Sequence, residues 1–86
     1  MRIELSLHSL ERIKERKIDR SIVIKAINFP DKIENSVVNK KRFLIKKIYY
    51  HRVWKKDHLL MVIAEREKGS LKVVTIIDTS KISKYF

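Results

Sequence analysis

The sequence predicts a single α+β domain of 86 residues, in which two short helices come before an antiparallel sheet. Two observations predict this fold class. Apolar residues recur at helical spacing before Pro30, whereas runs rich in Ile, Val, Tyr and Phe follow it. Only short segments separate those runs, and connections of that length join antiparallel neighbours. A chain of this length forms one domain, residues 1–86.

The first helix is predicted over residues 7–16. Polar and apolar side chains alternate before it, which indicates a brief extended segment at the start of the chain. Ser6 is a candidate N-cap. Leu7, Leu10 and Ile13 then share one helical face, which would bury itself against the rest of the domain.

The second helix is predicted over residues 20–28. Asp19 is its candidate N-cap, and Pro30 ends it because the residue before a proline disfavours helical backbone. The short connection between the two amphipathic helices predicts an αα-hairpin.

Four strands are predicted after the helices, at residues 33–38, 42–54, 59–65 and 71–77. Turns are predicted at residues 39–41, 55–58 and 67–70, the last with Gly69 at a positive φ. Residues 80–86 are expected to form a polar tail. The predicted architecture is a two-helix hairpin packed on one face of a four-stranded antiparallel sheet, with the other face left for solvent or ligand.

The net charge of +11 is concentrated in one segment of the chain. Residues 39–56 contain eight Lys and Arg and no acidic residue, whereas residues 1–38 carry a net charge of +2 and residues 57–86 of +1. A concentrated basic segment is the pattern expected of a protein that binds a phosphate backbone. The alternative is that the charge serves solubility at high temperature.

Composition excludes several classes of protein. Cysteine is absent, so disulfides and thiolate metal sites are excluded. The apolar runs are too short to span a bilayer, and the first residues lack the apolar core of a signal peptide, so a cytoplasmic protein is expected. Gln is absent while Lys, Glu and Ile are abundant, which fits a thermophile, although low-GC codon usage gives a similar bias.

Neither a metal nor a nucleotide cofactor is predicted. His8, His51 and His58 are the only histidines, and no pair has the spacing of metal ligands on a helix. The single glycine, Gly69, rules out a glycine-rich phosphate loop.

A polar stripe runs along the first predicted helix. His8, Arg12 and Arg16 stand four residues apart and therefore line one face. The guanidinium groups are suited to holding a phosphate, and an imidazole can move a proton near neutral pH. The alternative is structural: the arginines pair with Glu11, Glu15 or sheet carboxylates, and the histidine caps the helix or packs.

Residues 8–18 resemble the opening of the domain-of-unknown-function 4258 family, whose pattern is His-x-x-x-Arg-x-x-x-Arg, then usually Gly, then Ile. A proline–acid pair after the second helix, an apolar strand with an embedded threonine and a basic tail with a tyrosine follow in the family's order. Two positions depart from the pattern. Lys17 stands where Gly is usual, and Phe29 stands where Asn precedes Pro30, with Asn28 one place early.

The resemblance implies a fold similar to RelE/ParE-like toxins and to metal-independent ribonucleases. By that resemblance His8, Arg12 and Thr75 would form the active site, and Arg42, Lys84 and Tyr85 are further candidates. The chemistry would be attack of a ribose 2′-hydroxyl on the adjacent phosphate, with proton transfer by the histidine and charge stabilisation by the arginines. Thr75 would donate a hydrogen bond, or is simply a β-branched strand residue.

The segment around residues 46–54 interleaves cations with aromatic side chains. Cations neutralise phosphates and aromatic faces stack unpaired bases, which favours a surface for single-stranded RNA. Alternatively the aromatics pack in the core or at an edge, and the lysines block unwanted sheet pairing. The RNA-binding candidates are Arg16, Lys40, Lys41, Arg42, Lys46, Lys47, Tyr49, Arg52, Trp54, Lys55, Lys56, Lys84 and Tyr85.

The leading functional hypothesis is therefore a toxin-like endoribonuclease that acts on single-stranded RNA without a metal. One alternative is a non-catalytic basic domain that binds nucleic acid. Another is a module whose partner is an acidic, antitoxin-like protein that covers the basic surface.

Overall fold

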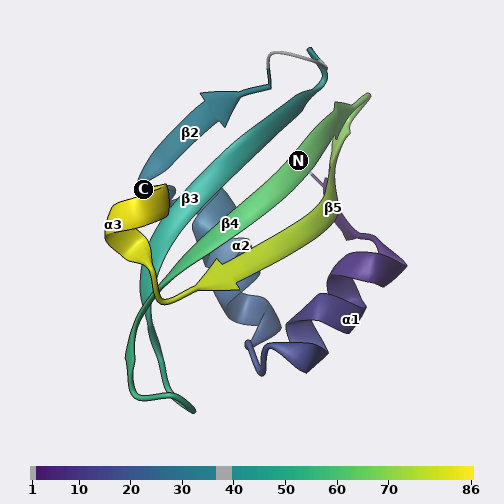
Figure 1. Cartoon of the computed structure of the whole chain (residues 1–86). Coiled ribbons are helices and arrows are strands. Elements are labelled where there is room, and N and C mark those ends of the chain that lie inside the picture. The colour runs from purple at the N-terminus through teal and green to yellow at the C-terminus, as the bar shows by residue number, and fades with distance from the viewer. Residues whose placement is uncertain (1, 37–39) are drawn as a thin grey trace.

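The computed structural model describes residues 2–36 and 40–86 of the chain. In these residues the elements follow one another in the order β1 (Arg2–Leu5), α1 (Leu7–Glu15), α2 (Arg20–Asn28), β2 (Lys32–Asn35), β3 (Arg42–His51), β4 (Lys56–Glu67), β5 (Ser70–Thr79) and α3 (Ile82–Tyr85). Figure 1 shows one twisted sheet with α2 behind it, α1 beside β5, and α3 in front of it, on the face away from α2. The α+β class predicted from the sequence is confirmed.

The sheet has five strands in the described residues, in the order β1-β5-β4-β3-β2. β1 runs parallel to β5, and the other neighbours are antiparallel. The prediction of a four-stranded, fully antiparallel sheet is therefore wrong. The reason is that Ile3 and Leu5 pack against the core. Burying them brings the backbone of β1 beside β5, whose edge supplies its hydrogen-bond partners.

The first two helices lie where the sequence predicts them, because their signals are local. Ser6 caps α1 by accepting a hydrogen bond from the Ser9 amide at 3.0 Å, and Asp19 caps α2 by accepting one from the Ser21 amide at 3.2 Å. The two helices do not form the predicted packed hairpin. α1 packs mainly against β5, and α2 against β3 and β4.

The turn after α1 is a Schellman motif built around Lys17. The amide of Ile18 donates to the carbonyl of Ile13 at 3.0 Å, and the amide of Lys17 donates to the carbonyl of Lys14 at 3.2 Å. Ile13 and Ile18 are both buried in the core, which fixes the direction in which the chain leaves the helix. Lys17 has a φ of 53°, in the left-handed region that favours glycine.

We expect Lys17→Gly to raise the free energy of unfolding by about 1 kcal/mol, because glycine removes the steric cost of the left-handed conformation. Urea denaturation followed by circular dichroism measures the change. Lys14→Gly is the matched control, since it places glycine inside the same helix and should lower stability by about the same amount. Loss of stability in both variants would contradict this account of the turn.

The hydrophobic core lies between the sheet and the first two helices. Its fully or nearly fully buried members are Ile13, Ile18, Val23, Ala26, Ile45, Leu60, Val62, Ala64, Leu71, Val73 and Ile76. β4 is the central strand, and its apolar side chains are buried on both faces. This burial matches its nearly continuous apolar sequence.

A β-bulge in β5 changes which of its side chains face the helices. Ala64 pairs with Val73 and Ile63 pairs with Thr75, so β5 holds one extra residue at this point. The extra residue reverses the alternation along the strand. After the bulge Asp78 faces the helices, whereas Thr75 lies on the opposite, open face of the sheet.

The β3–β4 connection differs from the prediction. β3 ends at His51 and β4 begins at Lys56, so the predicted strand over residues 42–54 is three residues too long and the turn at 55–58 is misplaced. Lys55 takes a φ of 53° and its amide donates to the carbonyl of His51 at 2.7 Å. This bond closes the turn at residues 52–55 and moves His58 into a strand.

β2 is shorter than its predicted range of residues 33–38, because it ends at Asn35. Val38, the predicted end of that strand, and Asn39, the start of the predicted turn, lie outside the described residues.

The C-terminal residues form the short helix α3 rather than a simple polar tail. The Lys46 ammonium donates to the carbonyl of Tyr85 at 2.6 Å, and the Lys32 ammonium donates to the carbonyl of Phe86 at 2.8 Å. These bonds hold α3 against the open face of the sheet. No helix in the described part of the chain has the length and apolar character needed to cross a bilayer.

Candidate active site

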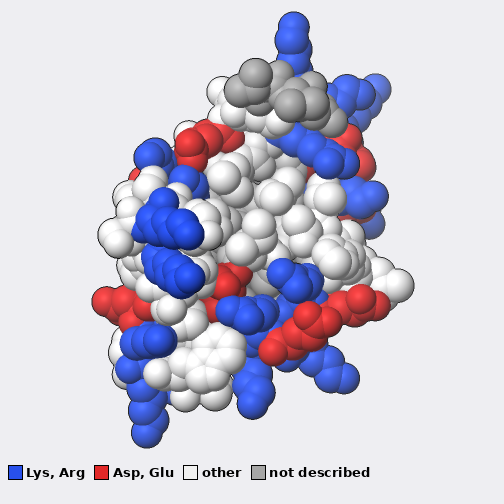
Figure 2. Space-filling view, in the orientation of Figure 1, with Lys and Arg blue, Asp and Glu red and all other residues white. Residues whose placement is uncertain are grey.

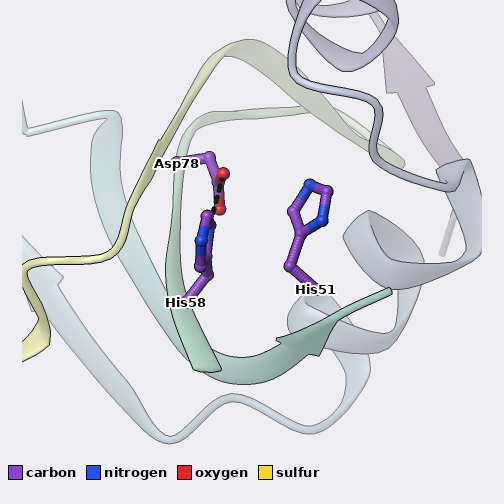
Figure 3. Close-up of side chains that lie close together, drawn as sticks. All are labelled: His51, His58 and Asp78. Carbon is purple, nitrogen blue, oxygen red and sulfur yellow. Dashed lines mark hydrogen bonds and ion pairs between the residues drawn. The ribbon is translucent and has the colours of Figure 1, made fainter. Parts of the chain in front are cut away.

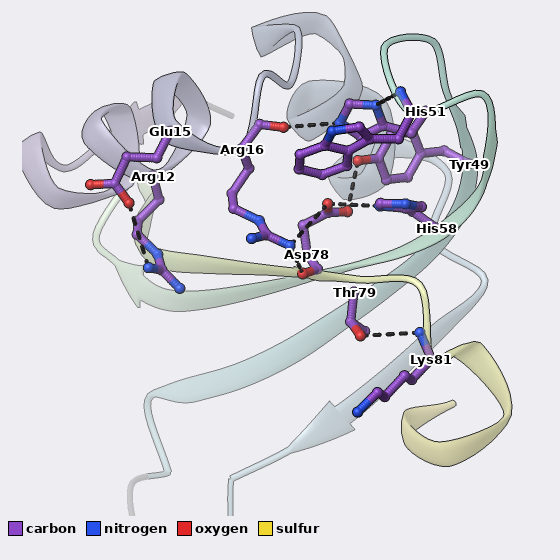
Figure 4. Close-up of polar contacts among 10 residues, drawn as sticks. Arg12, Glu15, Arg16, Tyr49, His51, His58, Asp78, Thr79 and Lys81 are labelled. Carbon is purple, nitrogen blue, oxygen red and sulfur yellow. Dashed lines mark hydrogen bonds and ion pairs between the residues drawn. The ribbon is translucent and has the colours of Figure 1, made fainter.

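Three polar side chains from three neighbouring strands meet on the helix-facing side of the sheet. Tyr49 of β3 stands directly opposite His58 of β4, and the bulge brings Asp78 of β5 to the same face. The Tyr49 hydroxyl donates to Asp78 Oδ1 at 2.7 Å, and His58 Nδ1 lies 2.8 Å from Asp78 Oδ2 (Figures 3 and 4). His58 and Asp78 are buried, with 2% and 5% of their surfaces exposed.

The contact with Asp78 fixes the tautomer of His58. A carboxylate oxygen only accepts, so Nδ1 carries the proton that is donated to it. In the neutral ring Nε2 therefore holds the lone pair, and it is buried with no hydrogen-bond partner. A buried Asp that orients a His through Nδ1 is the arrangement by which several enzymes prepare Nε2 to accept a proton.

His51 is held differently, by two backbone contacts. Its Nε2 lies 2.9 Å from the carbonyl of Arg16 and donates to it, and its Nδ1 accepts from the amide of Trp54 at 3.2 Å. Both ring nitrogens are thus occupied. His51 joins the turn at residues 52–55 to the end of α1, and neither nitrogen is left for proton transfer.

The same residues form the one cluster of three potential metal ligands in the described part of the chain. Ligand atoms of His51, His58 and Asp78 lie within 4.8 Å of one another. His51 has no free nitrogen, and both Asp78 oxygens already accept hydrogen bonds. Of the four ring nitrogens only His58 Nε2 has no hydrogen-bond partner, so a metal ion would have to displace the contacts that hold His51 and the donor set does not support one.

Arg16 reaches the cluster from the end of α1. Its Nη2 donates to the carbonyl of Asp78 at 2.8 Å and lies 3.8 Å from Asp78 Oδ2 (Figure 4). The Schellman motif aims the backbone carbonyl of the same residue at His51. Arg16 therefore binds β3 and β5, the outer two of the three strands that carry the site, and its guanidinium remains partly exposed.

Trp54 lies over the two histidines. Its ring stacks on His51 at a centroid distance of 4.3 Å and on His58 at 5.3 Å, with interplanar angles of 21° and 29°. The Arg16 guanidinium lies 5.1 Å from the same indole. A shallow, open hollow beside this stack is lined by Arg16, Trp54, Lys56, His58, Thr79 and Ser80. An anionic ligand would meet two cations there.

Burial and the hydrogen bond to Asp78 raise the pKa of Tyr49, because the phenolate would be desolvated and would face a carboxylate. The unfolded chain ionises this tyrosine near pH 10, whereas folded Tyr49 keeps its proton to higher pH. Ionisation therefore favours the unfolded chain, and the stability that Tyr49 provides is present below pH 10 and lost above it.

We expect the pH dependence of this contribution to appear when the free energy of unfolding of Tyr49→Phe is compared with that of wild type. The stability gap between wild type and variant should be constant up to about pH 10 and shrink above it, by at most ~1.4 kcal/mol per pH unit. Urea denaturation at several pH values measures the gap. Tyr50→Phe, which changes an exposed ring on the same strand, is the control. A gap that widens above pH 10 would contradict the assignment.

The three residues predicted to be catalytic do not form a joint site. His8 is exposed at the beginning of α1, roughly 12 Å along the helix axis from Arg16. Arg12 lies beside β5 and pairs with Glu15 at 3.6 Å (Figure 4). Thr75 lies on the open face of the sheet, where its hydroxyl donates weakly to the carbonyl of Ile76 at 3.5 Å. No hydrogen bond or ion pair between described residues links any two of the three.

The basic segment is divided between the two ends and the middle of the β3–β4 hairpin. Lys40, Lys41 and Arg42 are at one end, roughly 30 Å along β3 from Arg52, Lys55 and Lys56 at the other. Figure 2 shows that on the open face the Lys and Arg side chains lie in separate groups around an uncharged central area. A strand spreads its residues over its length and both faces, so the cations that are contiguous in the sequence lie apart on the folded chain.

Several of these cations are paired within the protein. Lys46 is buried and pairs with Glu34, and this contact lowers the pKa of Glu34 through the hydrogen bond from the ammonium. Lys47 pairs with Asp31 at 3.5 Å and Arg42 with Glu65 at 3.4 Å. Lys84 and Tyr85 belong to α3 on the open face, where their side chains lie against each other at 5.3 Å.

Of the predicted RNA-binding residues, the structure brings Arg16, Tyr49, Trp54 and Lys56 together. Three of them line the hollow, while the Tyr49 hydroxyl lies beneath it on Asp78. Arg52 and Lys55 are exposed in the adjoining turn.

Sequence reasoning missed His58 and Asp78. Placing the turn at residues 52–55 would have predicted the pairing of Tyr49 with His58. Asp78, an acid directly after the apolar run 71–77, would have been the signal for the carboxylate.

The family comparison agrees with the resemblance noted in the sequence. The model of the family described as "Domain of unknown function (DUF4258)" matches residues 5–78, which include Arg16, Tyr49, His58 and Asp78. No match to the chain was found among curated proteins or among solved structures. The predicted similarity to RelE/ParE-like folds is therefore not confirmed by a solved structure. The chain belongs to the DUF4258 family, which the match over most of its length shows.

Proposed function

We propose that this protein cleaves single-stranded RNA without a metal, with His58 as the residue that transfers the proton. One observation carries the proposal. His58 has its Nδ1 proton fixed by buried Asp78 and a lone pair on Nε2 that no protein group uses, beside a hollow that Arg16 and Lys56 line. A fixed tautomer, a free base and adjacent cations are the groups that phosphodiester transfer requires.

The reaction would be an internal transfer on the RNA backbone. His58 Nε2 takes the proton of a ribose 2′-hydroxyl, and the oxygen attacks the adjacent phosphorus. The bond from phosphorus to the 5′-oxygen breaks, and that oxygen takes a proton from Lys56 or water. The products are a 2′,3′-cyclic phosphate and a 5′-hydroxyl end. Arg16 and Lys56 would offset the charge that builds on the phosphate oxygens.

This proposal keeps the activity class implied by the resemblance to RelE/ParE-like toxins and moves the proton-transfer role from His8 to His58. Arg16 keeps its proposed contact with phosphate. Arg12 and Thr75 are given structural roles, at the edge and on the open face of β5 respectively.

The proposal is tested with an oligonucleotide that is DNA except for one unpaired ribonucleotide. Purified protein and a metal chelator are added, and the products are identified by mass spectrometry. We expect cleavage only after the ribonucleotide, with a cyclic phosphate on one product. The same oligonucleotide with a 2′-O-methyl group at that position is the control, because it lacks the nucleophile. If the oligonucleotide stays uncleaved at the ribonucleotide in the presence of excess protein, the proposal is wrong.

A second candidate function is nucleic-acid binding without catalysis. The observation that favours it is the burial of His58 Nε2, which in this conformation does not reach solvent. The His58–Asp78 pair would then be structural. The exposed cations of the turn at residues 52–55 and of the hollow would hold the phosphate backbone.

Both functions predict that RNA or DNA backbone binds at the hollow end of the hairpin. We expect the triple variant Arg52→Ala, Lys55→Ala, Lys56→Ala to reduce the dependence of binding on salt. The slope of log K against log salt should fall by about 2, since each lost contact with a single strand removes ~0.7. Fluorescence anisotropy of a labelled DNA oligonucleotide measures it.

The matched control removes the same charge from the other end of the sheet. The triple variant Lys40→Ala, Lys68→Ala, Lys72→Ala changes three exposed lysines near the β4–β5 turn. It should keep most of the wild-type slope of log K against log salt. Equal effects of the two triple variants would show that binding follows net charge rather than the hollow.

A further inference from the structure

His58 is the candidate base, yet its free nitrogen does not reach solvent, and the position of Trp54 explains why. The Nε2 atom of His58 is the unused base of the candidate site, yet it is buried and has no hydrogen-bond partner. A buried polar atom without a partner is unfavourable and rare, and it calls for an explanation. Two rings lie close to the imidazole: the His51 ring at 4.8 Å and tilted, and the Trp54 ring at 5.3 Å with an interplanar angle of 29°. Hydrogen bonds fix both ring nitrogens of His51, so Trp54 is the ring of the two that can move.

Trp54 belongs to a segment that the sheet holds only at its ends. The turn at residues 52–55 lies between β3 and β4 and has no strand partner, and Lys55 in it has a φ of 53°. The Trp54 amide is fixed to His51, whereas the indole is held by stacking and by the Arg16 guanidinium and is 39% exposed. The ring can therefore turn outward while the backbone stays in place.

We propose that Trp54 is a displaceable lid, and that the structure shows the site with this lid closed over His58. The inference rests on the proposed function, because it concerns access to the same base. When the indole turns away, Nε2 of His58 comes into contact with the hollow that Arg16 and Lys56 line. Opening is local and does not require the sheet to unfold.

The three histidines of the chain make this testable within one sample. Diethyl pyrocarbonate modifies a free imidazole nitrogen, and peptide mass spectrometry gives a separate rate for each histidine. His8 is exposed and reports unhindered reaction. His51 has both nitrogens engaged and 2% exposure, so it reports global unfolding. We expect wild-type His58 to react more slowly than His8 and faster than His51.

Removing the lid should change only His58. We expect Trp54→Ala to raise the rate at His58 by about tenfold, which is the population change that the loss of an aromatic stack allows. The rates at His8 and His51 should stay as in wild type. Trp54→Phe, which keeps an aromatic ring over the imidazole, should lie close to wild type.

Two results would overturn the lid. In wild type, equal rates at His58 and His51 would show that Nε2 is exposed only on unfolding, and equal rates at His58 and His8 would show that nothing covers it. The wild-type rates test the lid even if Trp54→Ala does not fold. It also needs no RNA, so a slow but measurable reaction at His58 together with intact RNA would reject the proposed cleavage and keep the lid.

Discussion

Replacing His58 with asparagine is expected to lower the rate of RNA cleavage by about 10²–10⁴-fold, which is the usual contribution of a general acid or base. Asparagine can still donate from its amide to Asp78, so the hydrogen bond beneath the site is kept. What disappears is Nε2, the atom that no other protein group contacts. Single-turnover cleavage of an oligonucleotide with one ribonucleotide measures the effect.

His8→Asn is the matched control for this variant. It makes the same substitution at the exposed histidine of α1, which the family resemblance singled out. We expect it to cleave at the wild-type rate. The opposite ranking, with His8→Asn inactive and His58→Asn active, would return the proton-transfer role to the stripe on α1.

Replacing Asp78 with alanine should produce the largest loss of stability. The carboxylate accepts from the Tyr49 hydroxyl and from His58 Nδ1, and its side chain has no exposed surface. Alanine leaves buried His58 and the partly buried Tyr49 hydroxyl without a partner, and removal of one member of a buried polar set costs about 3 kcal/mol. In a domain of this size that lowers Tm by roughly 12–24 °C. Differential scanning calorimetry measures the shift.

Asp57→Ala is the control for charge, since it removes an exposed carboxylate from the adjacent strand and should change Tm little. Asp78→Asn separates the two bonds, because the amide oxygen still accepts from Tyr49 while the amide nitrogen cannot accept from His58. We expect it to fall between wild type and alanine. A stable Asp78→Ala protein would show that the three side chains are not coupled.

The sequence was sufficient for features that depend on neighbouring residues. The caps at Ser6 and Asp19 and the ends of both helices follow from side chains within one turn. The glycine expected after Arg16 also had a physical meaning, because Lys17, which takes its place, has the left-handed backbone that glycine adopts readily.

The candidate site could not be predicted in the same way, because strand register decides it. A hairpin turn shifted by three residues hid the pairing of Tyr49 with His58. One extra residue in β5 exchanged the faces of Thr75 and Asp78, and no local pattern marks that bulge. The resemblance to a family of unknown function identified the stripe on α1, of which only Arg16 reaches the site.

The parallel pairing of β1 with β5 has a consequence for how this chain folds. Ser6 caps α1 and also donates from its hydroxyl to the carbonyl of Val74, 68 positions later in the sequence. As a ribosome makes the chain, the first strand has no partner until the last one has emerged. The edge of the sheet formed by β1 is therefore completed late, and loop closure over this span slows folding relative to a chain with only hairpin contacts.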